Sequence, residues 1–368
     1  MKRREFLKSA AAAGVAVGAA ATVTGCTREQ IEGGGGPNIA RRKKVRLKLA
    51  TSWPAHFPIM GTGVERFAQK VHDLSGGSLE IKIYPKNILV PALAVFDATS
   101  RGQIDAFHSG PYYWKGKNPA FALFSGAPLR MTANELNCWM NYGGGYDLWR
   151  ELYAKYNLYP FIGGNTGVQM GGWFRKPIER LEDLKGLKMR IPGLGGEVMA
   201  KLGVNPILLP AGEIYTALER GTIDATEWVG PALDIRMGFY KVAKYYYTGW
   251  HEPGSILELT FNKARYDRLS DEHKAVIHCA AEAMSGEMYH EFMHKNAVAL
   301  KELESMDIEI RDFPPQIIEA AKKAMNEVAK EQSEKSADFK RVFDSMEKYY
   351  ALIKPWTQIS ETRFCTIR

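Results

Sequence analysis

Strand-like and helix-like patterns alternate along most of this 368-residue chain, and this alternation limits its fold more than any other feature. The run "KVRLKLATSW" alternates apolar and basic residues, as a half-buried strand does. A helix pattern follows at about residues 61–75 and stops at Gly76-Gly77. Because alternating strands and helices form open sheets that helices cover, the sequence predicts an α/β fold with mostly parallel sheets.

One phrase occurs twice within this alternation. Residues 101–106 read "RGQIDA" and residues 220–225 read "RGTIDA", each at a helix end followed by a glycine turn and a strand. The repeat predicts two similarly built lobes, and the alternative is a common α/β corner that recurs by chance. We expect the first lobe at residues 44–162, with part of 253–310, and the second at residues 163–252.

The chain after the second lobe has a different character. Residues 268–306 lack proline and contain glycine only at Gly286, with Ser270 placed to cap the start of a helix. This pattern predicts one long helix that braces both lobes. Residues 311–368 are predicted to form C-terminal helices.

The N-terminus has the pattern of an export signal. Residues 1–26 begin with charged residues that include Arg3-Arg4, continue with a short stretch rich in Ala and Gly, and end at Cys26. The arginine pair resembles a twin-arginine signal, and the residues before Cys26 resemble a lipobox, which would lipidate that cysteine in the periplasm. Residues 27–43 are predicted to be a flexible linker.

Composition excludes several functional classes. A chain with 45% hydrophobic residues is not globally disordered, and a net charge of +8 without a stripe of basic and aromatic residues does not indicate nucleic-acid binding. The four cysteines form no C-x-x-C pair. No serine elbow or cysteine–histidine arrangement indicates catalysis.

Several polar residues lie where predicted strands end, which is where open α/β sheets bind ligands. Arg190 ends a strand just before a helix, and its planar guanidinium suits a carboxylate. Glu227 lies directly before Trp228, and Glu252 lies two positions after Trp250. Together they suggest an oxygen-rich site for Na⁺ or Ca²⁺, to which Gln169 adds an amide oxygen. The alternative for each of these charged residues is a structural salt bridge.

A second candidate site lies on the long predicted helix. His290, Glu291 and His294 match the H-E-x-x-H pattern, in which two histidines bind zinc and the glutamate activates water. No third histidine follows at the usual spacing. An exported zinc hydrolase is therefore the less favoured hypothesis.

Three stretches resemble one protein family. The runs "GGWFRKPIERLEDLKGLKMRIPGLGGEVMAKLG", "LPAGEIYTALERGTIDATEWVGP" and "YYYTGWHEPGS" resemble the solute-binding proteins of tripartite ATP-independent periplasmic (TRAP) transporters, over about residues 44–350. The resemblance is strongest to the group that binds 2-oxo acids such as pyruvate together with a metal cation. It implies a two-lobed periplasmic solute-binding fold of a type II-like class, without catalysis, that delivers its ligand to the membrane subunits of a transporter.

The resemblance also implies roles for particular residues. Arg190 would hold the ligand carboxylate, and Tyr112 or Tyr113 would close the site from the first lobe. The ligands of the Na⁺ or Ca²⁺ ion would be Gln169, Glu227, the Trp228 carbonyl and Glu252. Members of the group dimerise by exchanging a C-terminal helix, for which "DFKRVFDSMEKYYALIKPW" is the candidate. A sensor protein that binds another small carboxylate, such as lactate, remains an alternative.

Overall fold

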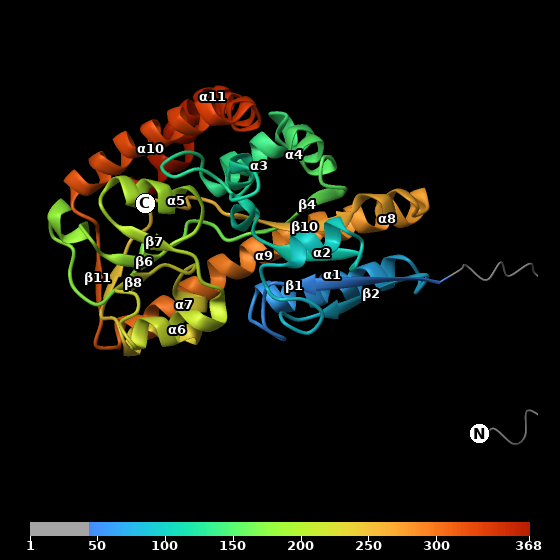
Figure 1. Cartoon of the computed structure of the whole chain (residues 1–368), viewed down its shortest axis with the longest axis horizontal. Helices are drawn as coiled ribbons and strands as arrows, with labels where there is room; N and C mark the ends of the chain where they lie inside the picture. The colour runs from blue at the N-terminus through green and yellow to red at the C-terminus, as the bar shows by residue number, and fades with distance from the viewer. Residues whose placement is uncertain (1–43) are drawn as a thin grey trace, which may run out of the picture. The chain divides into compact units, whose positions relative to one another are not determined.

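The computed structural model describes residues 44–368, which lie in one compact unit. The predicted export signal, Cys26 and the linker of residues 27–43 lie outside the described residues. Two open sheets organise the unit (Figure 1). The strands of the first sheet are, in spatial order, β2 (Leu79–Tyr84), β1 (Val45–Thr51), β3 (Ala106–Ser109), β10 (Ile256–Asn262) and β4 (Leu158–Asn165). The strands of the second sheet are β11 (Glu309–Arg311), β9 (Tyr245–Tyr247), β5 (Gly172–Phe174), β8 (Ala225–Thr226), β6 (Lys188–Arg190) and β7 (Asn205–Ile207).

Helices cover both sheets. The α-helices before the long helix are α1 (Met60–Leu74), α2 (Val95–Ser100), α3 (Ala133–Tyr142), α4 (Gly145–Ala154), α5 (Gly193–Lys201), α6 (Ala211–Glu219), α7 (Pro231–Met237) and α8 (Lys263–Asp267). Short 3₁₀ turns are η1 (Pro111–Trp114), η2 (Pro119–Phe124), η3 (Leu181–Leu184) and η4 (Phe239–Lys241). The later helices are α9 (Asp271–Glu304), α10 (Pro315–Lys335), α11 (Ala337–Thr357), the π-helical turn η5 (Gln358–Thr362) and α12 (Arg363–Cys365). We call the first sheet with α1–α4, η1 and η2 the first lobe, and the second sheet with α5–α7 the second lobe.

Each sheet has a parallel part and an antiparallel part. In the first sheet β1 runs parallel to β2 and β3, whereas β10 runs antiparallel to β3 and β4. In the second sheet β6 runs parallel to β7 and β8, whereas β5 runs antiparallel to β8 and β9. The expected two-sheet α/β fold is confirmed. Besides the passage through α9, which leads from β10 to β11, the chain crosses between the sheets twice, and the antiparallel strands flank these two crossings.

These crossings are residues 166–171, between β4 and β5, and residues 248–255, between β9 and β10. Backbone hydrogen bonds tie the crossings to each other: the N–H of Thr166 donates to the Ser255 carbonyl at 2.9 Å, and the N–H of Gln169 donates to the Glu252 carbonyl at 3.0 Å. Two of the predicted cation ligands, Gln169 and Glu252, therefore lie side by side where the lobes are joined.

The repeated phrase has the same structural role in both lobes. Gly102 and Gly221 have positive φ angles of 74° and 71°, a conformation that glycine adopts without strain, and each ends a helix. The aspartate that follows fastens the next strand to its neighbour. Asp105 accepts a backbone N–H of β1 at 2.7 Å, and Asp224 accepts one of β6 at 2.9 Å. The repeat therefore sets equivalent strands, β3 and β8, in equivalent places.

Helix α9 contacts both lobes. It begins after Ser270, whose side chain accepts the backbone N–H of His273 at 3.2 Å, so the predicted cap is confirmed. Along its length α9 packs against α1 and β4 of the first lobe and against α7 of the second (Figure 1). Beyond α9 the chain adds β11 to the second sheet beside β9, outside the range expected for the second lobe.

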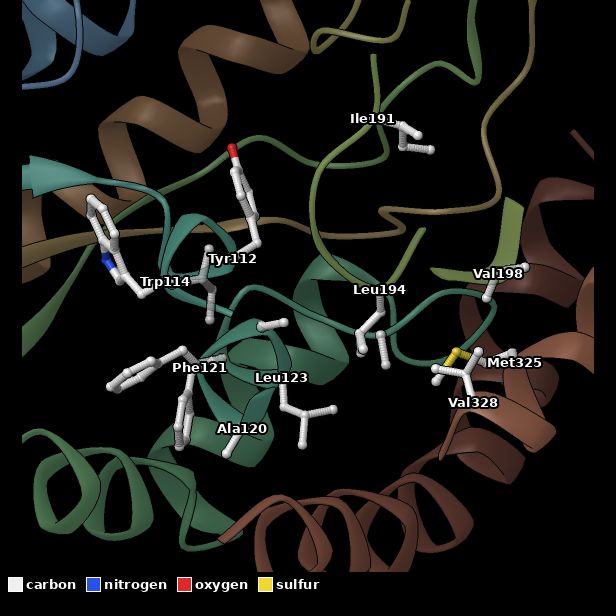
Figure 2. Packing of buried hydrophobic residues seen from close by; sticks show 14 of the residues in the cluster. Tyr112, Trp114, Ala120, Phe121, Leu123, Ile191, Leu194, Val198, Met325 and Val328 are labelled. Atoms are coloured by element: carbon white, nitrogen blue, oxygen red, sulfur yellow. The ribbon is translucent and has the colours of Figure 1, made fainter. Parts of the chain in front are cut away.

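Apolar packing also joins the lobes to the C-terminal helices. One cluster contains Tyr112 and Leu123 from the first lobe, Leu194 from α5 and Met325 from α10 (Figure 2). Helix α10 packs on α5, whereas α11 packs on η2, α3 and α4. The pair α10–α11 thus spans from the second lobe to the first. No helix within residues 44–368 is long and apolar enough to cross a membrane.

Candidate functional site

Arg190 is the centre of a polar site between the lobes. It is the last residue of β6, and its side chain is only 1% exposed. The Nε donates to the Leu209 carbonyl at 3.2 Å, and Nη1 donates to the Glu227 carbonyl at 3.1 Å and forms an ion pair with the Glu227 carboxylate. The Nη2 lies 3.4 Å from the Tyr113 hydroxyl, and the guanidinium stands over the Trp228 ring at 5.2 Å. The Arg190 guanidinium therefore lies where the two lobes meet.

Glu227 directly follows β8, which places it beside the end of β6. One carboxylate oxygen pairs with Arg190, and the other lies 3.4 Å from Nε2 of His251. Both partners are as buried as Glu227 itself. A buried carboxylate is costly unless it is paired, so this charge depends on Arg190.

Asp234 fixes the segment that carries Glu227 and Trp228. One of its oxygens accepts the backbone N–H groups of Val229 and Gly230, both at 3.1 Å. The other accepts Trp173 Nε1 at 3.0 Å and the Tyr246 hydroxyl at 2.9 Å. The chain direction after β8 is therefore set by a buried carboxylate on the first turn of α7.

Glu252 is the second carboxylate of the site, and it is 5% exposed. Burial raises the pKa of Glu252 well above its ordinary value, and the charge of Glu227 raises it further. Among residues 44–368, no group donates a hydrogen bond to its Oε2. Gly193 lies between Tyr112 and Glu252 and keeps both of them close. A Cβ added to Gly193 would lie 3.2 Å from Tyr112 Cβ and 3.7 Å from Glu252 Oε1. Glu252 therefore presents an unsatisfied buried oxygen within the site.

The two tyrosines come from η1 of the first lobe. Their ring centroids are 4.6 Å apart in an edge-to-face arrangement. Burial raises the pKa of both Tyr112 and Tyr113, so both phenols stay protonated at neutral pH. Of the two, Tyr113 is the one whose hydroxyl contacts the Arg190 guanidinium from the first lobe.

Gln169 and Trp228 complete the residues that the sequence singled out. The Gln169 side chain is buried, and its Nε2 donates to the Thr166 hydroxyl at 3.2 Å. The Trp228 ring packs edge-on against Trp53 and Phe57 of the first lobe, with centroids 6.3 Å and 6.4 Å away. In the part of the chain described, its Nε1 has no hydrogen-bond partner.

The oxygen atoms gathered in the site suit a hard cation, which prefers oxygen ligands. Two buried carboxylates share the site with one guanidinium, and one carboxylate oxygen lacks a donor. Over residues 44–368, His, Cys, Asp and Glu side chains form no group of three or more that would bind a metal. A cation here would therefore be held by Glu227 and Glu252 together with amide and carbonyl oxygens, which is the chemistry of Na⁺ or Ca²⁺.

The H-E-x-x-H hypothesis is wrong. His290 and His294 are exposed on α9, and Glu291 forms ion pairs with Arg66 and with Lys295, the latter at 2.6 Å. Because Arg66 belongs to α1, Glu291 fastens α9 to the first lobe. Its carboxylate is thus engaged in structure and is not free to activate water.

The sequence did not identify His251 or the pairing of Arg190 with Glu227. The Arg190 and Glu227 side chains meet although 37 positions separate them in the sequence. His251 lies directly before Glu252 in the run "WHEPG", so that run was the available signal. The cysteines Cys138, Cys279 and Cys365 are free and lie outside the site.

Comparison with known proteins identifies relatives along almost the whole chain. The model of a family described as bacterial extracellular solute-binding protein, family 7, matches residues 49–336. A monocarboxylate 2-oxoacid-binding periplasmic protein of Nostoc sp. (strain PCC 7120) is 38% identical over 369 residues, which cover 99% of this chain and 98% of that protein.

Two solved structures are each 44% identical to this chain. A TRAP periplasmic solute-binding protein from Colwellia psychrerythraea, with bound calcium and pyruvate, superposes with a TM-score of 0.86 over 88% of this chain and 99% of that one. Another from Pseudoalteromonas atlantica, with bound sodium and pyruvate, has a TM-score of 0.87 over 89% and 100%.

Proposed function

The chain belongs to family 7 of the bacterial extracellular solute-binding proteins, and from this premise we propose that its interlobe site binds a small 2-oxo monocarboxylate together with Ca²⁺ or Na⁺. Proteins of this family bind solutes for transport and are not enzymes. The observation that carries the proposal is the pair of buried carboxylates beside one guanidinium, with an unsatisfied oxygen on Glu252. Relatives that bind pyruvate with calcium or sodium support it.

Arg190 is the proposed anchor for the ligand carboxylate. In the structure described here, its Nη1 is occupied by Glu227 and its Nη2 faces Tyr113. An incoming carboxylate competes with Glu227 for the guanidinium, because both are planar anions. The exchange leaves the Glu227 carboxylate without its strongest partner. We therefore expect ligand binding to be coupled to binding of a cation.

Gln169, Glu227, the Trp228 carbonyl and Glu252 are the proposed ligands of that cation. When bound, a Ca²⁺ or Na⁺ ion supplies the positive charge that balances the two carboxylates beside an anionic ligand. Two observations support this set: the backbone N–H of Gln169 donates to the Glu252 carbonyl, and the charge of Glu227 raises the pKa of Glu252.

The pH dependence of cation affinity is a test of this proposal. The raised pKa keeps Glu252 protonated at pH values where an exposed glutamate is ionised, so a cation must displace a proton. We expect calcium affinity, with pyruvate present, to rise as pH rises above the ordinary pKa of a glutamate, by up to about tenfold per unit while Glu252 is protonated. Calorimetry in two buffers of different ionisation enthalpy measures the affinity and the released proton. No binding at any pH would refute the proposed function, and binding without proton release would remove Glu252 from the cation site.

The membrane subunits of a TRAP transporter are the proposed recipients of the ligand. Export through a twin-arginine signal in residues 1–26, and lipidation of Cys26 in the periplasm, belong to the same proposal. A sensor that uses the same site for lactate is the alternative, and it differs in lacking a preference for the 2-oxo group.

A second copy of the chain is the proposed partner of the C-terminal helices. Helix α11 buries Phe339, Val342 and Met346, but its end and the following turns leave large apolar side chains exposed. These exposed residues are Leu352, Trp356, Ile359, Phe364 and Ile367. Exchange of this segment between two copies would cover them, as the family resemblance implies.

A further inference from the structure

A half-buried ion pair joins the two lobes beside the candidate site. Lys115 follows η1 in the first lobe, and Glu197 lies on α5 in the second. The Nζ of Lys115 is 2.6 Å from Glu197 Oε1, and the side chains are 29% and 22% exposed. Because the two residues belong to different lobes, this contact forms only when the lobes are together.

The carboxylate of Glu197 is held from both sides. Its other oxygen, Oε2, accepts a hydrogen bond from Nε2 of Gln332 on α10, at 2.9 Å. Helix α10 packs on α5, so Gln332 orients the carboxylate from the side of the second lobe. A carboxylate that is already oriented loses less side-chain freedom when Lys115 reaches it, which strengthens the pair.

The pair lies on the wall of a cavity that shares Tyr112 and Tyr113 with the candidate site. This cavity has a volume of about 230 Å³, and its lining includes Tyr112, Tyr113, Ile191 and Leu208 as well as Lys115 and Glu197. Tyr113 is the residue that contacts Arg190 across the lobes. Figure 2 shows Tyr112 on η1 and, beyond Leu194, the packing of Val198 on α5 against Met325 and Val328 on α10.

We propose that Lys115 and Glu197 are positioning residues that hold the lobes closed over the bound ligand and thereby set its rate of dissociation. They do not touch Arg190 or the carboxylates of the site, so they act through the relative position of the lobes. The kinetic part of this inference rests on the proposed function. The structural part does not, because lobe closure is measured without a ligand.

Lys115→Met and Glu197→Gln test the inference, with Lys201→Met as the matched control. Lys201 lies on α5 as well and pairs with Glu331 of α10, but that pair does not cross between the lobes. In stopped-flow tryptophan fluorescence with Ca²⁺ and pyruvate, we expect both test variants to release pyruvate about 3- to 10-fold faster, with association rates changed less than about twofold. The double variant should behave like either single variant, because each single change already removes the pair.

Small-angle scattering of the ligand-free proteins supplies the second readout. The test variants should have a larger radius of gyration than the wild type and Lys201→Met, with unchanged circular dichroism. Dissociation rates and radii equal to those of the control would overturn the inference. Failure of the wild type to bind pyruvate would refute the proposed function, and the radii alone would then decide whether the pair holds the lobes.

Discussion

Replacement of Arg190 with methionine should weaken pyruvate binding by about 30-fold to several thousandfold, which corresponds to about 2–5 kcal/mol for a buried charged contact whose partner is left unpaired. Methionine keeps much of the apolar volume over the Trp228 ring but removes every donor of the fork. The ligand carboxylate would then face Glu227 and Glu252 without a guanidinium. Calorimetry with saturating calcium measures the loss.

Two further variants separate lost recognition from lost stability. Arg190→Met leaves Glu227 buried without its ion-pair partner, so we expect a lower melting temperature. Arg190→Met combined with Glu227→Gln removes both charges and should recover stability without recovering ligand binding. Arg130→Met is a matched control, because the Arg130 side chain is only 13% exposed and also forms an ion pair. Its Nε lies 2.7 Å from Glu347 Oε1, and this pair lies outside the site. Equal pyruvate affinity in Arg190→Met and Arg130→Met would exclude Arg190 as the anchor.

Glu252→Gln should weaken cation binding and stabilise the cation-free protein at neutral pH. The raised pKa of Glu252 means that the folded chain holds this proton more tightly than the unfolded chain does. Stability of the cation-free protein therefore falls as pH rises above the ordinary pKa of a glutamate, and glutamine removes this penalty. Calcium affinity should drop by at least about 10- to 100-fold, the range seen when even outer-shell partners of metal ligands are lost.

Glu258→Gln is the control for this experiment. Burial raises the pKa of Glu258 to about 7, and its carboxyl accepts Trp114 Nε1 and the Thr260 hydroxyl within the first lobe. It is a buried carboxyl like Glu252, but it lies among first-lobe residues. Thermal melting and calcium titration of both variants give the comparison. Similar calcium affinity in both would assign Glu252 a structural role.

Local sequence patterns predicted the elements that depend on local forces. Ser270 capped the long helix as expected, and the alternating residues of "KVRLKLATSW" gave β1. The antiparallel strands β4 and β10 were not predicted. Their pairing joins residues about a hundred positions apart, and β4 contains Pro160 and two glycines that obscure a strand pattern.

For the candidate site, too, individual residues could be predicted from the sequence, whereas the contacts between them could not. Arg190 and Glu227 were identified because strand ends are exposed to ligands in this type of sheet, and Glu252 because it lies in an aromatic-rich turn. Their mutual arrangement was not predictable, since the contact of Arg190 with Glu227 depends on β6 and β8 being neighbours. The repeated phrase was informative because each copy fixes one strand against its neighbour with an aspartate. That placed β3 and β8, and with them Tyr113 and Glu227, at matching ends of two sheets.

Titration of chelator-treated protein with pyruvate, with no added cation, with Na⁺ and with Ca²⁺, tests most directly whether cation and carboxylate bind as one coupled unit. We propose that Glu227 turns from Arg190 to a cation when a carboxylate ligand takes its place, so each should favour the other. We expect pyruvate affinity to rise when the effective cation is present, and cation affinity to rise by the same factor when pyruvate is present. Equal pyruvate affinity in all three solutions would contradict the account and leave Glu227 as a structural partner of Arg190.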